Sequence, residues 1–272
     1  MAAVDILQAI ILGAIQGLTE WLPISSSGHL ALVQLAMGLK VPVFYDAVLH
    51  LGTLTGVFAI YRKDIANVVK SIFGQNRAEA KEGAHRPQGG RMLWFIVLGT
   101  IPTATIGLAF SSFFEYSFYD PLSIGVGFIV TGVFVLITLF LKAGSKKLDA
   151  ADAVLIGVGQ GLSIFSSISR SGATVAAGMF RGVEREQLVR YSFLLSVPAI
   201  LGAAAVDMIS ADEQERAELY SIGIESYIVG AAISAAVGYA SIRVLIRLVI
   251  RGKFYLFAFY CFAIGIATFL LL

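Results

Sequence analysis

Residues able to do chemistry gather in two short polar stretches of an otherwise apolar chain. The first stretch holds hydrogen-bonding or ionisable side chains within fourteen positions: Gln16, Glu20, Ser25, Ser26, Ser27 and His29. The second, residues 157–172, matches residues 13–28 after a shift of 144 positions (157 − 13), with eight of sixteen residues identical. Both copies keep Ser-x-Ser-Gly, which ends at Gly28 and at Gly172. The chain therefore contains an internal repeat centred on serine-rich turns.

The two copies differ at their ionisable positions. Glu20 and His29 have apolar counterparts in the second copy, and Arg170 takes the place of Ser26. Each serine turn is expected to open a helix, where serine suits the N-cap and the free N–H groups carry partial positive charge. Two such helix ends pointing together, with Arg170 between them, predict an anion site, most plausibly for phosphate.

Hydrolysis requires a nucleophile and a group to move its proton. His29 follows Ser26 by about one helical turn, and Glu20 follows Gln16 by four residues, so each pair shares one side of its helix. An ionisable residue at membrane depth is a functional hypothesis by default. The residues alone leave the nucleophile open between Ser26, His29 and water.

The composition predicts the elements that must position these groups. The chain is 57% hydrophobic and 14% charged, with a mean hydropathy of +0.83, whereas soluble domains are about one quarter charged. We therefore expect an all-α polytopic membrane protein. A net charge of +2 gives no indication of a nucleic-acid partner, and the single cysteine, Cys261, excludes an internal disulfide framework.

The polar stretches interrupt apolar segments and predict two broken helices, in residues 4–38 and 153–180. Irregular backbone at membrane depth survives only where protein buries it or water reaches it. We expect half-helices at about 4–20 and 26–38, and a second such hairpin later. Six full spans are expected at 43–61, 92–111, 122–141, 191–209, 226–242 and 254–272.

Basic loops set the expected orientation, because Lys and Arg are in excess on the cytoplasmic side. The basic segments are 62–91, 142–147, 181–190 and 243–253. Their common placement inside requires both broken segments to be re-entrant hairpins. Three spans then follow each hairpin, so the halves 1–147 and 148–272 of a single transmembrane domain, 1–272, should be inverted relative to each other. Such repeats place their site near the midplane.

The motifs resemble a known family. Gln16-Gly-Leu-Thr-Glu20 with Pro23 to His29, and Ser169-Arg170-Ser171-Gly-Ala-Thr174, look like the two signature regions of the undecaprenyl-diphosphatases, membrane proteins associated with bacitracin resistance. The second signature begins with Pro-Gly in that family, where this chain has Ser166-Ser167. The likeness covers the whole chain in length and motif spacing.

The resemblance implies hydrolysis of a polyprenyl diphosphate to its monophosphate and inorganic phosphate. The reaction would occur at the outer face of the plasma membrane and recycle a lipid carrier for envelope glycans. Ser26 would be the leading nucleophile candidate, Glu20 and His29 would handle protons, and Arg170 would hold the diphosphate. The implied substrate-binding residues are Gln16, Ser25, Ser27, Ser169, Ser171 and Thr174. A divalent cation, Mg²⁺ or Ca²⁺, would be held mainly by substrate phosphates.

Other interpretations stay open. The inverted repeat also suits a lipid or small-solute transporter, or a flippase. Arg170 could serve as a structural partner of Glu20. His50, in an apolar run, is expected to take part in core packing or in a hydrogen bond between helices. The segment 62–91 is expected to be a solvated connection whose Lys63 and Lys70 could touch anionic lipid. Membrane lipids are the expected surroundings, and the oligomeric state, a homodimer included, is not fixed by the sequence.

Overall fold

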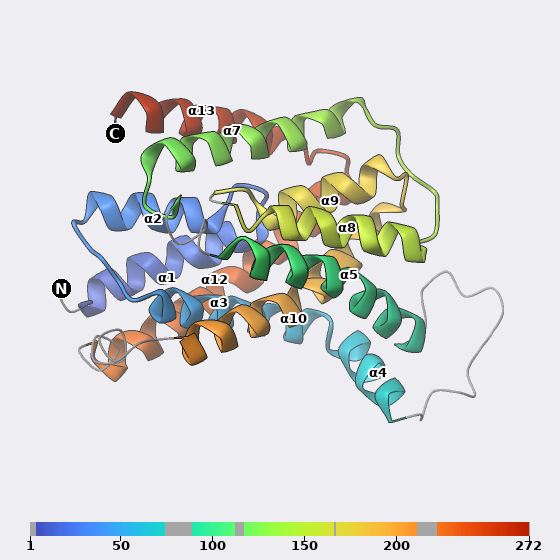
Figure 1. Ribbon diagram of the computed structural model, residues 1–272, viewed down its shortest axis with the longest axis horizontal. Coiled ribbons are helices and arrows are strands. Elements are labelled where there is room, and N and C mark those ends of the chain that lie inside the picture. The colour runs from blue at the N-terminus through green and yellow to red at the C-terminus, as the bar shows by residue number, and fades with distance from the viewer. Residues whose placement is uncertain (1–3, 74–88, 112–116, 166, 211–221, 272) are drawn as a thin grey trace.

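The computed structural model describes residues 4–73, 89–111, 117–165, 167–210 and 222–271 (Figure 1). Within these ranges the regular structure is helical, apart from an isolated bridge between Lys146 and Val183. The helices in chain order are α1 Ile6–Trp21, α2 Ser26–Ala36, α3 Val43–Ile60, α4 Arg62–Ile72, α5 Gly89–Ala109, α7 Pro121–Ile137, the 3-10 turn η1 Thr138–Phe140, α8 Ala150–Leu162, α9 Arg170–Phe180, α10 Arg185–Ser210, α12 Ile224–Ile250 and α13 Leu256–Leu271. The expected all-α class is confirmed.

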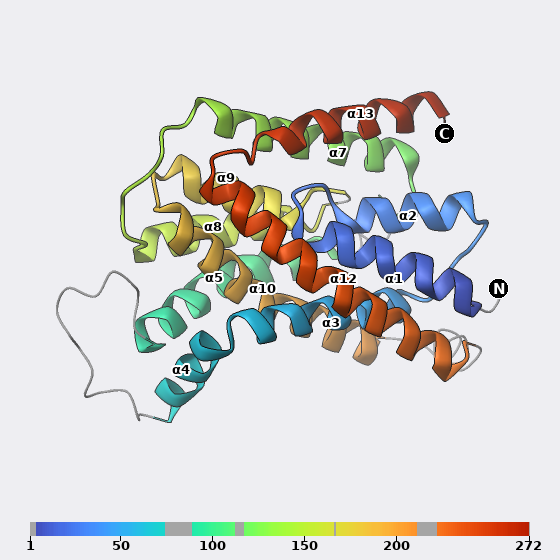
Figure 2. The same cartoon turned by 180° about the vertical axis from the view of Figure 1, so that it is seen from behind.

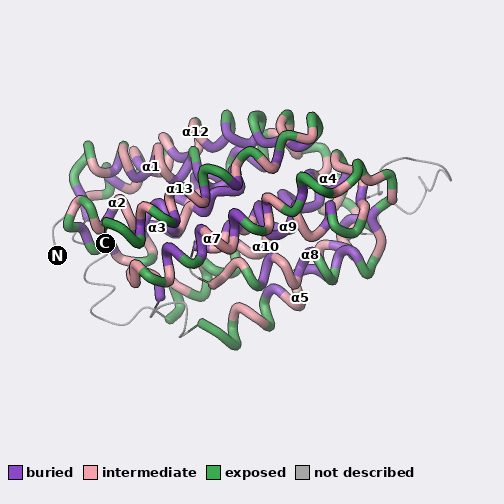
Figure 3. The backbone as a smooth tube through the Cα atoms, turned by 90° about the horizontal axis from the view of Figure 1, so that it is seen from above, coloured by how far each residue is buried: buried purple, intermediate pink, exposed green. Residues whose placement is uncertain are grey.

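Five helical segments are long and apolar enough to cross a membrane: α3, α5, α7 with η1, α10 and α12. They correspond to five of the six expected spans. The sixth, 254–272, is represented by α13, which has 16 residues, fewer than the roughly 20 that a full crossing takes. The all-α polytopic class therefore stands, while the count of six spans stays a prediction. Apolar side chains such as Leu108 and Phe140 are exposed on helix surfaces, as lipid contact requires, and buried stretches face inward (Figure 3).

Two loops expected from the sequence are shorter in the structure, because the neighbouring helices extend into them. Arg243 and Arg247 lie inside α12, which continues to Ile250, and α10 already begins at Arg185. Charged side chains did not end these helices because long Arg side chains can extend along a helix surface to reach a polar layer. The boundaries inferred from charge alone were therefore wrong by up to two helical turns. Pro102 lies inside α5, which continues through it.

The expected connection after α3 begins with a helix. Arg62–Ile72 forms α4, a helix with basic residues and an exposed apolar side that includes Val69 and Ile72. Asp64 of α4 forms an ion pair with Arg190 of α10, which fixes the helix to the bundle. A basic amphipathic helix of this kind suits the membrane–water boundary. None of the residues of α4 is buried, so a solvated connection that touches lipid stays a prediction for them, and 74–88 lie outside the described ranges.

Both expected interrupted helices are present. The side chains of Asp5 and Asp149 cap the starts of α1 and α8, each through a reciprocal capping box. Ser25 and Ser169 cap α2 and α9 by accepting from the backbone N–H three residues later. Both pairs of caps are 144 positions apart, the same shift that aligns the sequence copies. The repeat seen in the sequence is thus a repeat of local structure.

The two hairpins approach each other from opposite ends of the molecule. In Figures 1 and 2, α1 runs from the end that carries the N-terminus to the middle and α2 returns, whereas α8 and α9 do the same from the other end. The turn of each hairpin lies in the central region. This arrangement supports the expectation of opposite orientation, and it places Ser26 and Arg170 at the inner ends of their helices.

Each hairpin packs against a helix of the other half of the chain. The helix α1 packs along α12, and α8 packs along α5. Both contacts depend on glycine: a Cβ on Gly13 would lie 2.5 Å from the carbonyl oxygen of Gly230, and one on Gly157 would lie 2.2 Å from that of Gly99. Small residues of this kind let membrane helices approach closely. The boundary between halves at residue 147 stays a prediction.

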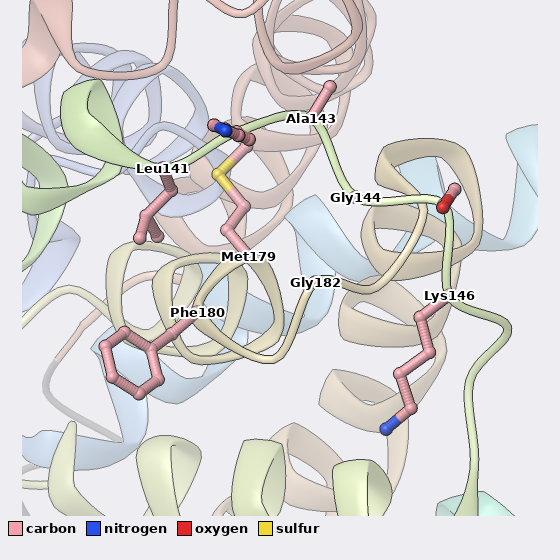
Figure 4. A pocket seen from close by; sticks show the side chains of 9 residues that line it. Leu141, Ala143, Gly144, Lys146, Met179, Phe180 and Gly182 are labelled. Atoms are coloured by element: carbon pink, nitrogen blue, oxygen red, sulfur yellow. The ribbon is translucent and has the colours of Figure 1, made fainter.

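A surface hollow of about 400 Å³ lies between the 141–146 loop and the end of α9 (Figure 4). Beside it, the buried carboxylate of Asp152 binds Lys146 at 2.8 Å and Arg181 at 2.8 Å. A hydrogen bond from the Asp152 backbone N–H, together with Lys146, lowers the pKa of Asp149 to about 2. These ionic contacts tie the loop and the end of α9 to the start of α8, away from the hairpin turns.

Candidate active site

Glu20 is the centre of the polar cluster between the two hairpin turns. It lies in the last turn of α1 and is 6% exposed. Its Oε2 accepts hydrogen bonds from Gln16 Nε2 at 2.9 Å and from Ser26 Oγ at 2.6 Å. Its Oε1 accepts from Arg170 Nη2, so the expected pairing of these two residues is present. The carboxylate thereby joins the first hairpin to the second.

Ser26 is the first residue of α2, and the turn before it has an unusual backbone. Ser25 has a φ of 64°, in the left-handed region that residues other than glycine seldom adopt. Backbone of this kind, at a cost of about 1–3 kcal/mol, is characteristic of functional sites. Here the turn directs the Ser26 hydroxyl to Glu20. A hydroxyl hydrogen-bonded to a buried carboxylate is the arrangement that activates a serine nucleophile.

Arg170 is the first residue of α9 and the repeat counterpart of Ser26. Its guanidinium lies over the ring of Trp21, with 5.1 Å from Cζ to the ring centroid. One nitrogen binds Glu20, whereas Nη1 is buried and has no hydrogen-bond partner among the described residues. Buried donors are seldom left without partners in proteins. An anion beside Glu20 and Ser26 would supply the missing acceptor.

The expected substrate-binding serines mainly support the two turns. The hydroxyl groups of Ser25 and Ser27 lie 3.3 Å apart, and those of Ser169 and Ser171 lie 3.2 Å apart. Ser25, Ser169 and Ser171 are buried, whereas Ser27 is half-buried.

Thr174 and Gln16 are also buried in the same cluster. Thr174 Oγ1 donates to the carbonyl oxygen of Arg170 at 2.9 Å and lies 2.6 Å from Ser192 Oγ. Gln16 keeps its Oε1 without a partner among the described residues. The structure thus places Thr174 behind Arg170 and Gln16 beside Glu20, and direct contact of either with substrate stays a prediction.

His29 is turned away from Ser26. Its Nδ1–H donates to the backbone carbonyl of Ser25 at 2.6 Å, and its Nε2 accepts from the hydroxyl of Tyr260 at 2.7 Å. The ring also meets Phe128 edge to face, with 5.1 Å between centroids. Both nitrogens are engaged with groups other than Ser26 and Glu20. In this conformation His29 holds the left-handed turn in place.

His50 of α3 belongs to the cluster, although the two sequence motifs do not include it. Its Nε2 lies 3.3 Å from Glu20 Oε2, and its side chain is 27% exposed. Of the two roles expected for His50, core packing or a contact between helices, the structure shows a contact between helices. Its partner could not be predicted, because an apolar run on one helix does not reveal the polar group that another helix brings to it. The one available signal was the histidine itself, since ionisable residues in membrane helices commonly mark functional sites.

Comparison with known proteins agrees with the motifs and their geometry. A sequence model of the bacitracin resistance protein BacA matches residues 9–267. The chain belongs to the BacA family. A BacA relative from Carboxydothermus hydrogenoformans, named undecaprenyl-diphosphatase, is 40% identical over 97% of this chain and 96% of its own length.

Two further BacA relatives carry the same name. The protein of Korarchaeum cryptofilum is 38% identical over 98% of this chain and all of its own length. The protein of Methanosphaera stadtmanae is 38% identical over 98% of both chains. The expected family is thereby confirmed, and the likeness extends over the whole chain rather than over the two motifs alone.

The described residues of this BacA chain do not form a preorganised metal-binding site. They contain no group of three or more His, Cys, Asp or Glu side chains placed to hold a metal ion. Glu20 already receives hydrogen bonds from Ser26 and Arg170, and His50 adds a single nitrogen. Divalent Mg²⁺ and Ca²⁺ take six or more ligands, mostly oxygen. A cation would therefore need most of its ligands from water and from a bound phosphate.

Proposed function

We propose that this chain hydrolyses undecaprenyl diphosphate to undecaprenyl phosphate and inorganic phosphate, with Ser26 as the nucleophile. Membership of the BacA family and the diphosphatase names of its relatives support the reaction. The observation that carries the site is the Ser26 hydroxyl, 2.6 Å from a buried carboxylate that also pairs with Arg170. The same comparisons favour a hydrolase over a transporter.

The first step transfers the terminal phosphoryl group to Ser26. Its Oγ forms a bond to the terminal phosphorus as the bond to the bridging oxygen breaks, and the Ser26 proton passes to Glu20. Arg170 binds phosphate oxygens through Nη1, and the N–H groups at the starts of α2 and α9 add positive potential. Glu20 then gives its proton to the departing lipid phosphate, which restores the carboxylate.

The second step releases inorganic phosphate. A water molecule attacks the phosphoserine and transfers a proton to Glu20, the bond from phosphorus to Ser26 Oγ breaks, and the proton returns to Ser26. The geometry favours Ser26 over His29 as nucleophile, because both ring nitrogens of His29 are hydrogen-bonded elsewhere. His29 acts in this scheme by holding the Ser25 carbonyl.

The proposed function also concerns a divalent cation, the side of the membrane and the number of chains. A divalent cation carried by the substrate phosphates would neutralise charge, in keeping with the small number of protein ligands in the site. The excess of Lys and Arg favours a cytoplasmic position for the basic loops. The likeness to the BacA family favours a plasma-membrane protein whose site opens to the extracytoplasmic side. A homodimer stays compatible with this function, which needs residues of one chain only.

Phosphate release tests the reaction directly. We expect the purified full-length protein in detergent to release inorganic phosphate from undecaprenyl diphosphate, and to release less after a chelator removes divalent cations. Parallel samples without protein, and with an unrelated membrane phosphatase, set the background and the positive control. Lack of release by this chain, where the positive control releases phosphate, would refute the proposed function.

Gly28 tests the closeness of the two hairpins. A Cβ at this position would lie 2.6 Å from Ser167 Oγ and 2.8 Å from the ring of Phe128, so Gly28→Ala requires these side chains to move. We expect phosphate release to fall by about 100-fold, because small misplacements in a site cost that much. Gly202→Ala, where a Cβ meets nothing within 4 Å, is the matched control. Equal rates for both variants would show that the approach at Gly28 is unimportant.

A further inference from the structure

We propose that His50 is a positioning residue for Glu20, and that its protonated ring holds Glu20 as the carboxylate that accepts the Ser26 proton. The inference rests on the proposed diphosphatase function. His50 lies outside the two motifs, on α3, and reaches the site only through the packing of α3 against α1. Its contact is with the same oxygen, Oε2, that accepts from Ser26.

Both ring nitrogens of His50 face hydrogen-bond acceptors. Nδ1 lies 2.7 Å from the backbone carbonyl of Asp46, and Nε2 lies 3.3 Å from Glu20 Oε2. A carbonyl can only accept, so Nδ1 carries a proton. In a neutral ring Nε2 would then direct its lone pair at a carboxylate. The doubly protonated ring instead donates through Nδ1 and forms an ion pair with Glu20 through Nε2.

His29 shows that this requirement is specific to His50. The Nδ1 of His29 also faces a backbone carbonyl, that of Ser25, but its Nε2 faces the hydroxyl of Tyr260. A hydroxyl can donate, so a neutral His29 satisfies both of its contacts. The two histidines of the described residues therefore differ in their need for a second proton.

Negative charge lies close to the ring of His50. Glu20 faces it from α1, and Asp46 lies one turn earlier on its own helix, with both carboxylate oxygens accepting from Gln34 at 2.9 and 3.1 Å. Arg170 of α9 opposes this effect but binds the other oxygen of Glu20.

The other helices packed against α3 leave this balance in place. From α12, the hydroxyl of Ser234 donates to the Leu49 carbonyl. From α4 and α10, Asp64 and Arg190 neutralise each other. The Glu20 carboxylate is thus the ionic partner that the described residues give the His50 ring.

A pH dependence follows from this geometry. As pH rises and His50 loses its second proton, the ring no longer forms an ion pair with Glu20, and the carboxylate loses the contact that holds it beside Ser26. Turnover should then fall on the alkaline side. Glutamine at position 50 can donate an amide hydrogen at every pH, so it should keep the contact and remove this alkaline fall.

The experiment measures phosphate release from undecaprenyl diphosphate at about pH 5 to 9, with kcat and KM resolved. Wild type, His50→Gln, His50→Ala and a control, His85→Gln in the polar segment 62–91, are compared after thermal unfolding shows that each is folded. We expect kcat to fall by about 10- to 100-fold in His50→Ala with little change in KM. We expect His50→Gln to recover most of this loss and to lack the alkaline fall that wild type and His85→Gln show.

Two other results have separate meanings. An active wild type whose alkaline fall persists unchanged in His50→Gln, or a His50→Ala variant with the wild-type kcat, would overturn the role of His50 alone. An inactive wild type would overturn the proposed diphosphatase function, and the inference built on it. If His50→Ala does not fold, the pH profile of His50→Gln decides by itself.

Discussion

Ser26→Ala is expected to lower kcat for phosphate release by about 1,000-fold or more. The change removes the hydroxyl that donates to the Glu20 carboxylate at 2.6 Å. Arg170 and the helix N-termini remain, so KM should change little. Steady-state phosphate release and detection of a phosphorylated Ser26 peptide in acid-quenched wild-type protein provide the two measurements.

A serine with a purely local hydrogen bond provides the control for this result. The Ser71 hydroxyl donates to the Val68 carbonyl of its own helix, α4, so Ser71→Ala should keep the wild-type rate. If Ser26→Ala retained a rate within tenfold of wild type, attack by water or His29 would replace the serine mechanism. A phosphorylated residue other than Ser26 would lead to the same conclusion.

Arg170→Lys is expected to lower kcat/KM by at least about 100-fold, despite the conserved charge. Arginine offers several N–H donors in one plane, which lets it bind Glu20 and a phosphate oxygen together. A lysine ammonium is a compact charge and cannot keep both contacts in the same geometry. It also leaves the guanidinium position over Trp21 empty. The measurement is kcat and KM for phosphate release at fixed cation concentration.

Arg170→Ala should be at least as damaging, because Glu20 would lose its buried counter-charge. Arg247→Lys, at an exposed position in the last turn of α12, tests whether arginine loss as such affects the protein. Wild-type kinetics in Arg170→Lys would show that a single positive charge suffices and that planar recognition plays no part.

The sequence predicted those parts of the site that depend on local spacing. Gln16 and Glu20 are four residues apart and form the expected contact on one side of α1. Ser25 and Ser169 cap helices where the serine turns were expected to open them. Such features depend on residues that lie one or two helical turns apart in the sequence. The serine caps occur in both copies of the internal repeat.

The remaining features depend on contacts between distant segments. No local pattern places His50 beside Glu20, because the two helices meet only in the folded bundle. The rotation of His29 away from Ser26 depends on Tyr260, which is 231 residues away. The left-handed backbone of Ser25 likewise could not be predicted from the sequence, since serine adopts this conformation only when surrounding contacts stabilise it.

The packing of α1 along α12 also has a consequence for the order of assembly. Synthesis proceeds from the N-terminus, so α1 leaves the ribosome early, whereas its main partner is one of the last two helices to appear. Until then, the glycine face around Gly13 has no backbone to pack against. The first half of the chain, made alone, would therefore lack the surface that holds its own hairpin. The packing of the first hairpin in the nascent protein is thus completed only after α12 has entered the membrane.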